Sequence, residues 1–135
     1  MVRFEGAADR VGLATVLVVD DDAAVRKSLS RLICAAGFKV ETFDRPTAVL
    51  AGGIPTDNAC LVIDIGLPEM SGTELWLTLK RSGCELPSIF ITGQDNSRSK
   101  ELVGLPENVT VLYKPIDEVP LLVAINRAIA LSNTS

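Results

Sequence analysis

Polar residues follow four short apolar runs of this chain, and their types suit metal and phosphate chemistry. Runs rich in Val and Ile are typical of buried parallel strands, whose carboxyl ends lie at one edge of a sheet, so these side chains should converge. Three carboxylates together repel one another and need a cation, while a nearby lysine can hold an anionic group. The residues are Asp20 and Asp21 after 16–19, Asp64 after 60–63, Thr92 after 89–91 and Lys114 after 109–113.

A divalent cation with hard oxygen ligands fits this set. Mg²⁺ is preferred because it uses few carboxylates and bridges to phosphate oxygens, and Mn²⁺ should substitute for it. The adjacent pair Asp20 and Asp21 suits metal binding, whereas Asp64 stands alone and can attack phosphorus to form an aspartyl-phosphate. Lys114 would then neutralise one phosphoryl oxygen and the Thr92 hydroxyl would donate to another.

Each residue also has a purely structural interpretation. The acids at 20–22 could only cap a helix, and Asp64 could be a turn residue before Pro68. Thr92 could simply end a strand, and Lys114 could be a solvated lysine at a turn. Together these interpretations require four coincidences at the carboxyl ends of strands, all complementary in charge, and the shared site is favoured.

Strand and helix patterns alternate five times, which predicts an α/β fold. The expected strands are 16–19, 38–43, 59–63, 88–92 and 109–113, and the expected helices begin after Asp22, Asp44, Gly72 and Asp117 and at Gln94. The helix from Gln94 should end near Leu102, and the last should bury one face, made of Val119, Leu122, Ile125, Ala128 and Ile129. Right-handed crossovers predict a flavodoxin-like three-layer (βα)5 sandwich with a five-stranded parallel sheet in the order 2-1-3-4-5. Residues 1–14 are expected to be a flexible N-terminal extension and 15–131 the folded domain.

Composition narrows the class of protein. The chain has 135 residues, 47% of them hydrophobic and 22% charged, which favours one folded domain over disorder. A net charge of −4 argues against direct binding to nucleic acid. The absence of His excludes Ser-His-Asp and Cys-His catalysis, and the three cysteines show no metal or redox spacing. No run is long enough to cross a membrane or serve as a signal core, so a soluble, cytoplasmic protein is expected.

The motifs resemble the receiver domain of bacterial two-component response regulators over about residues 15–130. They are Val18-Val19-Asp20-Asp21-Asp22, Val62-Ile63-Asp64 through Gly72, Ile91-Thr92-Gly93 and Lys114-Pro115. The residues of two stretches, Met70-Ser71-Gly72 and Ile91-Thr92-Gly93, are similar to those of receivers of the FixJ type. The resemblance implies that Asp64 is the phosphoacceptor and that Asp20 and Asp21 hold Mg²⁺. It further implies that Thr92 and Tyr113 form a switch, that Lys114 is the family lysine, and that the Gly66 carbonyl is a metal ligand.

The resemblance also implies partners and a role. A sensor histidine kinase or histidine phosphotransfer protein would supply the phosphoryl group, because this chain has no His. Phosphorylation would repack the surface of the helix at 94–102, the strand at 109–113 and the last helix. In this family that surface often forms a homodimer or contacts an output domain. The chain would be a signalling protein that catalyses only its own phosphorylation and dephosphorylation.

Two other classes stay open. A phosphatase of the haloacid dehalogenase type also uses Mg²⁺ and a phospho-Asp, but it needs two acids two residues apart, followed by Thr or Val, and usually a cap domain. The sequence after Asp22 is Ala23-Ala24, and the chain leaves little room for a cap. The second class is a pseudo-receiver that only binds proteins, against which the full set of site residues argues.

Overall fold

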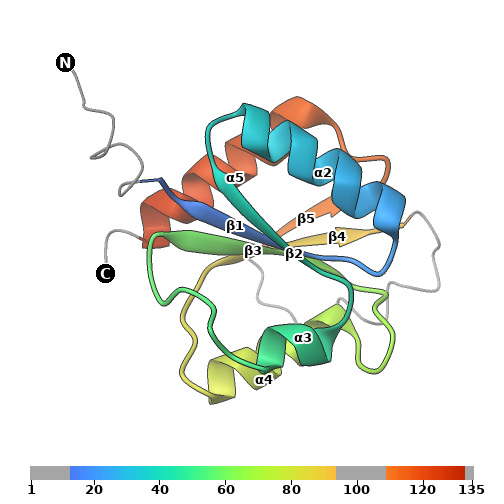
Figure 1. Cartoon of the computed structure of the whole chain (residues 1–135), viewed down its shortest axis with the longest axis vertical. Coiled ribbons are helices and arrows are strands. Elements are labelled where there is room, and N and C mark those ends of the chain that lie inside the picture. Colours follow the sequence, from blue (N-terminus) through green and yellow to red (C-terminus); the bar gives the residue numbers. More distant parts are fainter. Residues whose placement is uncertain (1–12, 94–108, 133–135) are drawn as a thin grey trace.

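Five parallel strands form the central sheet of the protein, with helices on both faces (Figure 1). The structure is a computed structural model that describes residues 13–93 and 109–132. The strand order β2-β1-β3-β4-β5 confirms the flavodoxin-like topology predicted from the sequence. The strands are β1 (Thr15–Val19), β2 (Lys39–Phe43), β3 (Ala59–Asp64), β4 (Ser88–Thr92) and β5 (Thr110–Tyr113).

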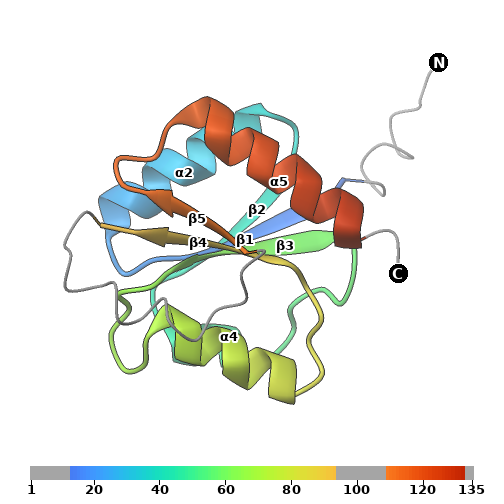
Figure 2. The same ribbon diagram turned by 180° about the vertical axis from the view of Figure 1, so that it is seen from behind.

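Two helices cover each face of the sheet in the described part of the chain. Helices α2 (Ala23–Ala35) and α5 (Glu118–Ser132) lie on one face, and α3 (Pro46–Leu50) and α4 (Gly72–Arg81) lie on the other (Figure 2). The helix expected at 94–102 lies outside the described residues, as does most of the expected extension at 1–14. The proposed domain limits therefore stay a prediction.

The core is divided by the sheet into two apolar layers. Every residue of β1 is buried, and alternate side chains point to opposite faces. Val16 and Val18 pack in the cluster under α2 and α5, whereas Leu17 and Val19 pack in the cluster over α3 and α4. Strands that are apolar on both faces leave only their ends for polar groups, which confines the chemistry to an edge of the sheet.

Side-chain caps begin two of the helices. The Asp22 carboxylate accepts from the backbone N–H groups of Ala24 and Val25, which confirms Asp22 as the cap of α2. At α4, Ser71 and Glu74 form a reciprocal capping box.

The expected Asp44 cap is wrong. Residue 45 occupies the cap position of α3 and makes no side-chain cap bond. The Asp44 carboxylate instead pairs with the Arg45 guanidinium through two contacts of 3.1 Å. The guanidinium of the adjacent Arg45 binds the Asp44 carboxylate in a bidentate manner and so competes with backbone N–H groups for it.

The buried face of α5 also differs from the expected one at its start. Val119 is 70% exposed, and the face is formed instead by Leu121, Ala124, Ile125 and Ala128. In an α-helix Val119 lies about 200° around the axis from Leu121, so both cannot face the sheet. Leu122 and Ile129 are partly buried against the same cluster.

No helix within residues 13–93 and 109–132 combines the length and apolar character needed to cross a membrane.

Gly72 begins α4 where the helix passes closest to β3. Its N–H donates to the Ile65 carbonyl at 2.8 Å. A Cβ atom at this position would lie 2.9 Å from both Ile63 Cγ2 and Ile65 Cα, and it would also collide with the Asp64 carbonyl oxygen. Only glycine allows the helix to start so near the strand that ends in Asp64.

We expect Gly72→Ala to lower the free energy of unfolding by roughly 1–3 kcal/mol, because overpacking against backbone forces α4 away from β3. Urea denaturation followed by circular dichroism measures the change. Gly93→Ala is the matched control, since a Cβ there meets nothing within 4 Å among the described residues. Equal transition midpoints for the two variants would contradict the close-approach argument.

Candidate functional site

Three carboxylates gather at the carboxyl ends of β1 and β3. Asp20 and Asp21 follow β1, Asp64 ends β3, and the two strands pair side by side in the sheet. One oxygen from each of the three acids lies within 4.8 Å of the others. Asp20 is fully buried and Asp64 is 5% exposed, whereas Asp21 is open to solvent. The predicted convergence of these acids is therefore present in the structure.

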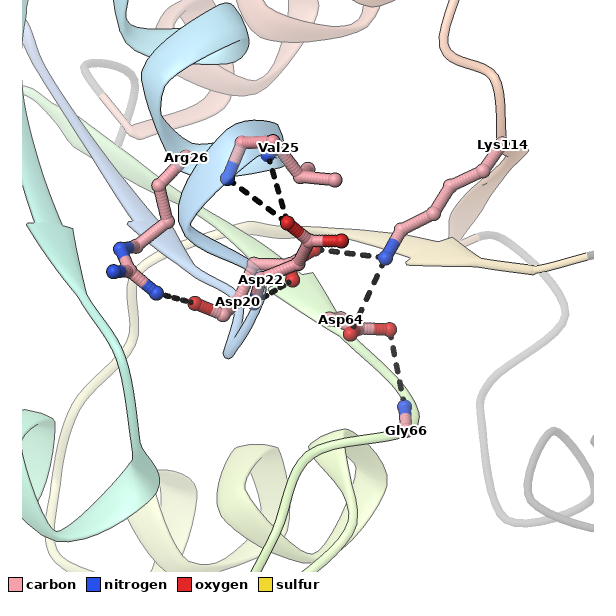
Figure 3. Close-up of polar contacts among 8 residues, drawn as sticks. Asp20, Asp22, Val25, Arg26, Asp64, Gly66 and Lys114 are labelled. Atoms are coloured by element: carbon pink, nitrogen blue, oxygen red, sulfur yellow. Dashed lines mark hydrogen bonds and ion pairs between the residues drawn. The ribbon is translucent and has the colours of Figure 1, made fainter.

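Lys114 joins the acids from the end of β5 (Figure 3). Its Nζ lies 2.9 Å from Asp20 Oδ2 in an ion pair and 3.4 Å from Asp64 Oδ2, to which it donates a hydrogen bond. The Lys114 N–H donates to the Thr92 carbonyl at 2.8 Å, which anchors the lysine to the end of β4. The interpretation of Lys114 as a solvated turn residue does not account for these contacts.

The three consecutive acids have different partners. Asp22 caps α2, and its own N–H donates to Asp20 Oδ1 at 2.9 Å. The helix-cap interpretation thus explains Asp22 but not Asp20 or Asp21, which face the site. A haloacid dehalogenase arrangement would need Asp20 and Asp22 as its two acids, and capping already occupies Asp22.

Asp64 combines a turn contact with a site contact. Its Oδ1 accepts from the Gly66 N–H at 3.1 Å, which is the local turn expected of an Asp before Pro68. Its Oδ2 faces Lys114. The turn interpretation is therefore compatible with a carboxylate in the site, and the expected metal contact of the Gly66 carbonyl stays a prediction.

Thr92 and Tyr113 are neighbours across β4 and β5, where their Cα atoms pair in register. Thr92 is 1% exposed, and its Oγ1 has no hydrogen-bond partner among the described residues. A buried hydroxyl without a partner is unfavourable, so a hydrogen bond from this hydroxyl to a ligand oxygen would stabilise the site. The Tyr113 side chain lies at the surface, 56% exposed.

Burial and charge shift the proton affinities of two site groups. Burial raises the pKa of Asp20 above its ordinary value near 3.8, and the Asp64 charge adds to the rise, although the Asp22 N–H and Lys114 oppose it. Burial also lowers the pKa of Lys114, but Asp20 and Asp64 outweigh burial and hold it above its ordinary value near 10.5. Lys114 therefore stays protonated near neutral pH, and its single positive charge only partly compensates the negative charge of the acids.

The donor set fits a small, hard divalent cation. All the grouped side chains offer carboxylate oxygens, and Asp20 Oδ2 is buried without a hydrogen-bond donor among the described residues. The ion pair with Lys114 supplies charge at this oxygen but not hydrogen-bond geometry. A cation bound by Asp20, Asp21 and Asp64 would offset both the burial of the Asp20 charge and its repulsion by Asp64.

The thiols do not contribute to the site. All three cysteines are free, and burial raises the pKa of Cys60 to about 12. A thiol with so high a pKa is almost wholly protonated near neutral pH and is a poor nucleophile.

Sequence reasoning missed one residue of the site. The Arg26 Nη1 atom donates to the Asp20 carbonyl oxygen at 2.8 Å (Figure 3). Arg26 belongs to the first turns of α2, four residues after the Asp22 cap. A cation one turn into a helix that follows three acids was the available signal, but the pattern does not specify a contact with a backbone carbonyl.

Comparisons with known proteins identify the family of this chain. The family described as response regulator receiver domain matches residues 16–126. The transcriptional regulatory protein FixJ of Azorhizobium caulinodans is 34% identical over 118 residues, which are 87% of this chain and 56% of that protein. The solved structure of FixJ-N is 34% identical with a TM-score of 0.75, covering 87% of this chain and 94% of that one. Response regulator StyR is 37% identical with a TM-score of 0.76, covering 89% and 61%. The chain spans about half the length of the curated relatives it matches.

We expect Asp20→Asn to stabilise the metal-free protein near neutral pH, by roughly the 0.5–2 kcal/mol common for single stabilising substitutions. The raised Asp20 pKa means that the folded state binds more protons than the unfolded chain at pH values just above 3.8. Wild-type stability should therefore fall as pH rises through that window. Thermal unfolding in EDTA across acid to neutral pH measures this slope, which should be smaller in Asp20→Asn. A variant less stable than wild type at neutral pH would show that the pair with Lys114 outweighs the desolvation of Asp20.

Proposed function

This chain belongs to the response regulator receiver domains of two-component systems, and from that premise we propose that it accepts a phosphoryl group on Asp64. The observation that carries the proposal is the buried Asp64 carboxylate, which shares the Lys114 ammonium with a second buried acid, Asp20. This arrangement combines a nucleophile with groups that can stabilise an incoming phosphoryl group. The role is regulatory, and the chemistry is limited to gain and loss of the chain's own phosphoryl group.

Asp20, Asp21 and Asp64 would hold Mg²⁺, with the Gly66 carbonyl as a further ligand by the family pattern. The carboxylate donor set and the buried Asp20 Oδ2 atom, which has no hydrogen-bond partner among the described residues, support this assignment. When bound, the ion would screen the acids and neutralise phosphoryl oxygens. Mn²⁺ prefers the same oxygen ligands and would substitute.

The proposed transfer requires a donor outside this 135-residue chain, which contains no His. A carboxylate oxygen of Asp64 attacks the phosphorus of a phosphohistidine on a sensor kinase or phosphotransfer protein. The new P–O bond forms as the P–N bond breaks, and the imidazole leaves with the electron pair of that bond. Lys114 lies 3.4 Å from Asp64 Oδ2, where it can neutralise a phosphoryl oxygen. The Thr92 hydroxyl, which has no partner among the described residues, can donate to another.

Phosphorylation would change the surface through Thr92 and Tyr113. The phosphoryl group adds about −1.5 to −2 charges at Asp64 and draws the Thr92 hydroxyl toward it. The space that Thr92 leaves would admit the Tyr113 ring, which is now 56% exposed. The affected surface comprises β5, α5 and residues 94–102, the last outside the described part of the chain. A homodimer or an output domain is the proposed recipient, and the cytoplasm the proposed location.

We expect the protein to gain the mass of one phosphoryl group when incubated with Mg²⁺ and acetyl phosphate or phosphoramidate. Asp64→Asn should gain none, because the amide is not a nucleophile toward phosphorus. Intact-protein mass spectrometry, repeated with EDTA, measures both. The matched control is Asp57→Asn, an exposed acid before β3 at the opposite edge of the sheet, which should behave as wild type. Phosphorylation of Asp64→Asn would refute the assignment, and an unmodified wild type would refute the proposed function.

Trp76 offers a reporter of the proposed Thr92 movement. Its ring packs edge-on against Phe90, with centroids 6.2 Å apart, and Phe90 lies two residues before Thr92 on the same face of β4. We expect phosphorylation to change the fluorescence of this single tryptophan. In Thr92→Val the mass gain should persist, while the fluorescence change should be reduced, because a methyl group cannot bond to the phosphoryl oxygen. An undiminished change in Thr92→Val would exclude Thr92 as the link.

A further inference from the structure

Arg26 lies beside the acidic site, and its guanidinium bonds to backbone instead of to a carboxylate. The Nη1 atom donates to the Asp20 carbonyl at 2.8 Å, in a partly buried contact that joins α2 to the end of β1 (Figure 3). The backbone of Arg26 is fixed in turn, since its N–H donates to the Asp22 carbonyl at 3.0 Å. The guanidinium therefore reaches back from a rigid helical turn to the residue from which the site begins.

With this contact, three polar groups of Asp20 have hydrogen-bond partners: its N–H, its Oδ1 and its carbonyl. The Asp20 N–H donates to the Phe43 carbonyl of β2 at 3.1 Å, and Asp20 Oδ1 accepts from the Asp22 N–H at 2.9 Å. The sheet register of β1 ends one residue earlier, with Val19. Arg26 thus holds the backbone carbonyl just beyond the regular sheet, where Asp20 and Asp21 project from consecutive positions.

Arg26 also lines a surface hollow next to Asp21. The hollow has a volume of about 320 Å³ and is lined by Asp21, Arg26, Asp44, Arg45, Pro68 and Glu69. The Arg26 charge lowers the pKa of Asp44, although the Arg45 guanidinium is the main cause of that shift. The Asp20 carbonyl, through a hydrogen bond, and Asp44, through its charge, therefore both attract the Arg26 guanidinium.

We propose that Arg26 is a positioning residue for the cation site, which holds the turn at Asp20 and Asp21 so that both carboxylates face Asp64. This inference rests on the Mg²⁺ site of the proposed function. Mg²⁺ demands near-ideal octahedral geometry at short distances, so a small displacement of one ligand weakens binding strongly. Groups that orient metal ligands from outside typically change metal affinity 10–100-fold when they are removed.

Removal of Arg26 would have opposite effects on Mg²⁺ binding through its charge and through its hydrogen bond. A cation near the site repels Mg²⁺, so its removal would strengthen metal binding if charge alone mattered. Loss of the contact with the Asp20 carbonyl would instead weaken metal binding. Lysine keeps the charge but loses the planar fork that fixes the guanidinium, so Arg26→Lys separates the two effects.

The test measures the dissociation constant of Mg²⁺ for the full chain, by titration of backbone amide NMR shifts at constant ionic strength. We expect the constant to rise about 10–100-fold in Arg26→Met and to rise also in Arg26→Lys. The matched control is Lys27→Met, which removes one positive charge from the exposed neighbour on the same helix and should leave the constant near the wild-type value. Thermal unfolding in EDTA, run on every variant, reports any loss of stability separately from metal binding.

Several outcomes would overturn the inference. Tighter or unchanged Mg²⁺ binding by Arg26→Met would leave Arg26 as a charge or a bystander. A lower unfolding temperature with an unchanged dissociation constant would make its role purely structural. Should Arg26→Met fail to fold, Arg26→Lys and Arg26→Gln carry the same comparison. A wild-type chain that binds no Mg²⁺ removes the proposed function itself, whereas wild-type binding that the Arg26 variants share rejects only the role of Arg26.

Discussion

The repulsion between buried carboxylates is the constraint on which the site depends. Three acids contribute three negative charges within a few ångströms, and the Lys114 ammonium returns one, which leaves two uncompensated. Two of these acids are shielded from water by the sheet, so solvent cannot replace the missing charge. Burial is the main cause of the raised pKa of Asp20, and the charge of Asp64 adds to it. A divalent cation would supply two positive charges and so balance the charge of the site.

The sheet makes this imbalance possible because its central strands β1, β3 and β4 are apolar on both faces. Polar groups can leave the core only at strand ends, and parallel strands bring those ends to one edge. The register of β1 with β3 and of β4 with β5 then sets which ends are neighbours. The two packed clusters and the close contact of Gly72 with β3 offset the cost of burying the Thr92 hydroxyl, which has no partner among the described residues.

Periodicity predicted the strands, their order and the meeting of Asp20, Asp21, Asp64 and Lys114, because burial of both sheet faces leaves few alternatives. It failed where two local partners compete. Asp44 could cap a helix or bind Arg45, and propensity does not rank a neighbouring guanidinium against backbone N–H groups. It also failed at Val119, since the first turn of a helix carries too few residues to fix its buried face. Arg26 was invisible because a long side chain can reach several partners from one position.

The site and the proposed switch share one piece of backbone. The Lys114 N–H donates to the Thr92 carbonyl. Lys114 and Thr92 are therefore joined through the pairing of β4 with β5. A phosphoryl group at Asp64 would interact with both at once, through charge with Lys114 and through a hydrogen bond with Thr92. A ligand shifts a conformational equilibrium only by its difference in interaction between two states. In the proposed switch the Thr92 hydroxyl would supply that difference, because it has no hydrogen-bond partner among the described residues and would gain one from the phosphoryl group.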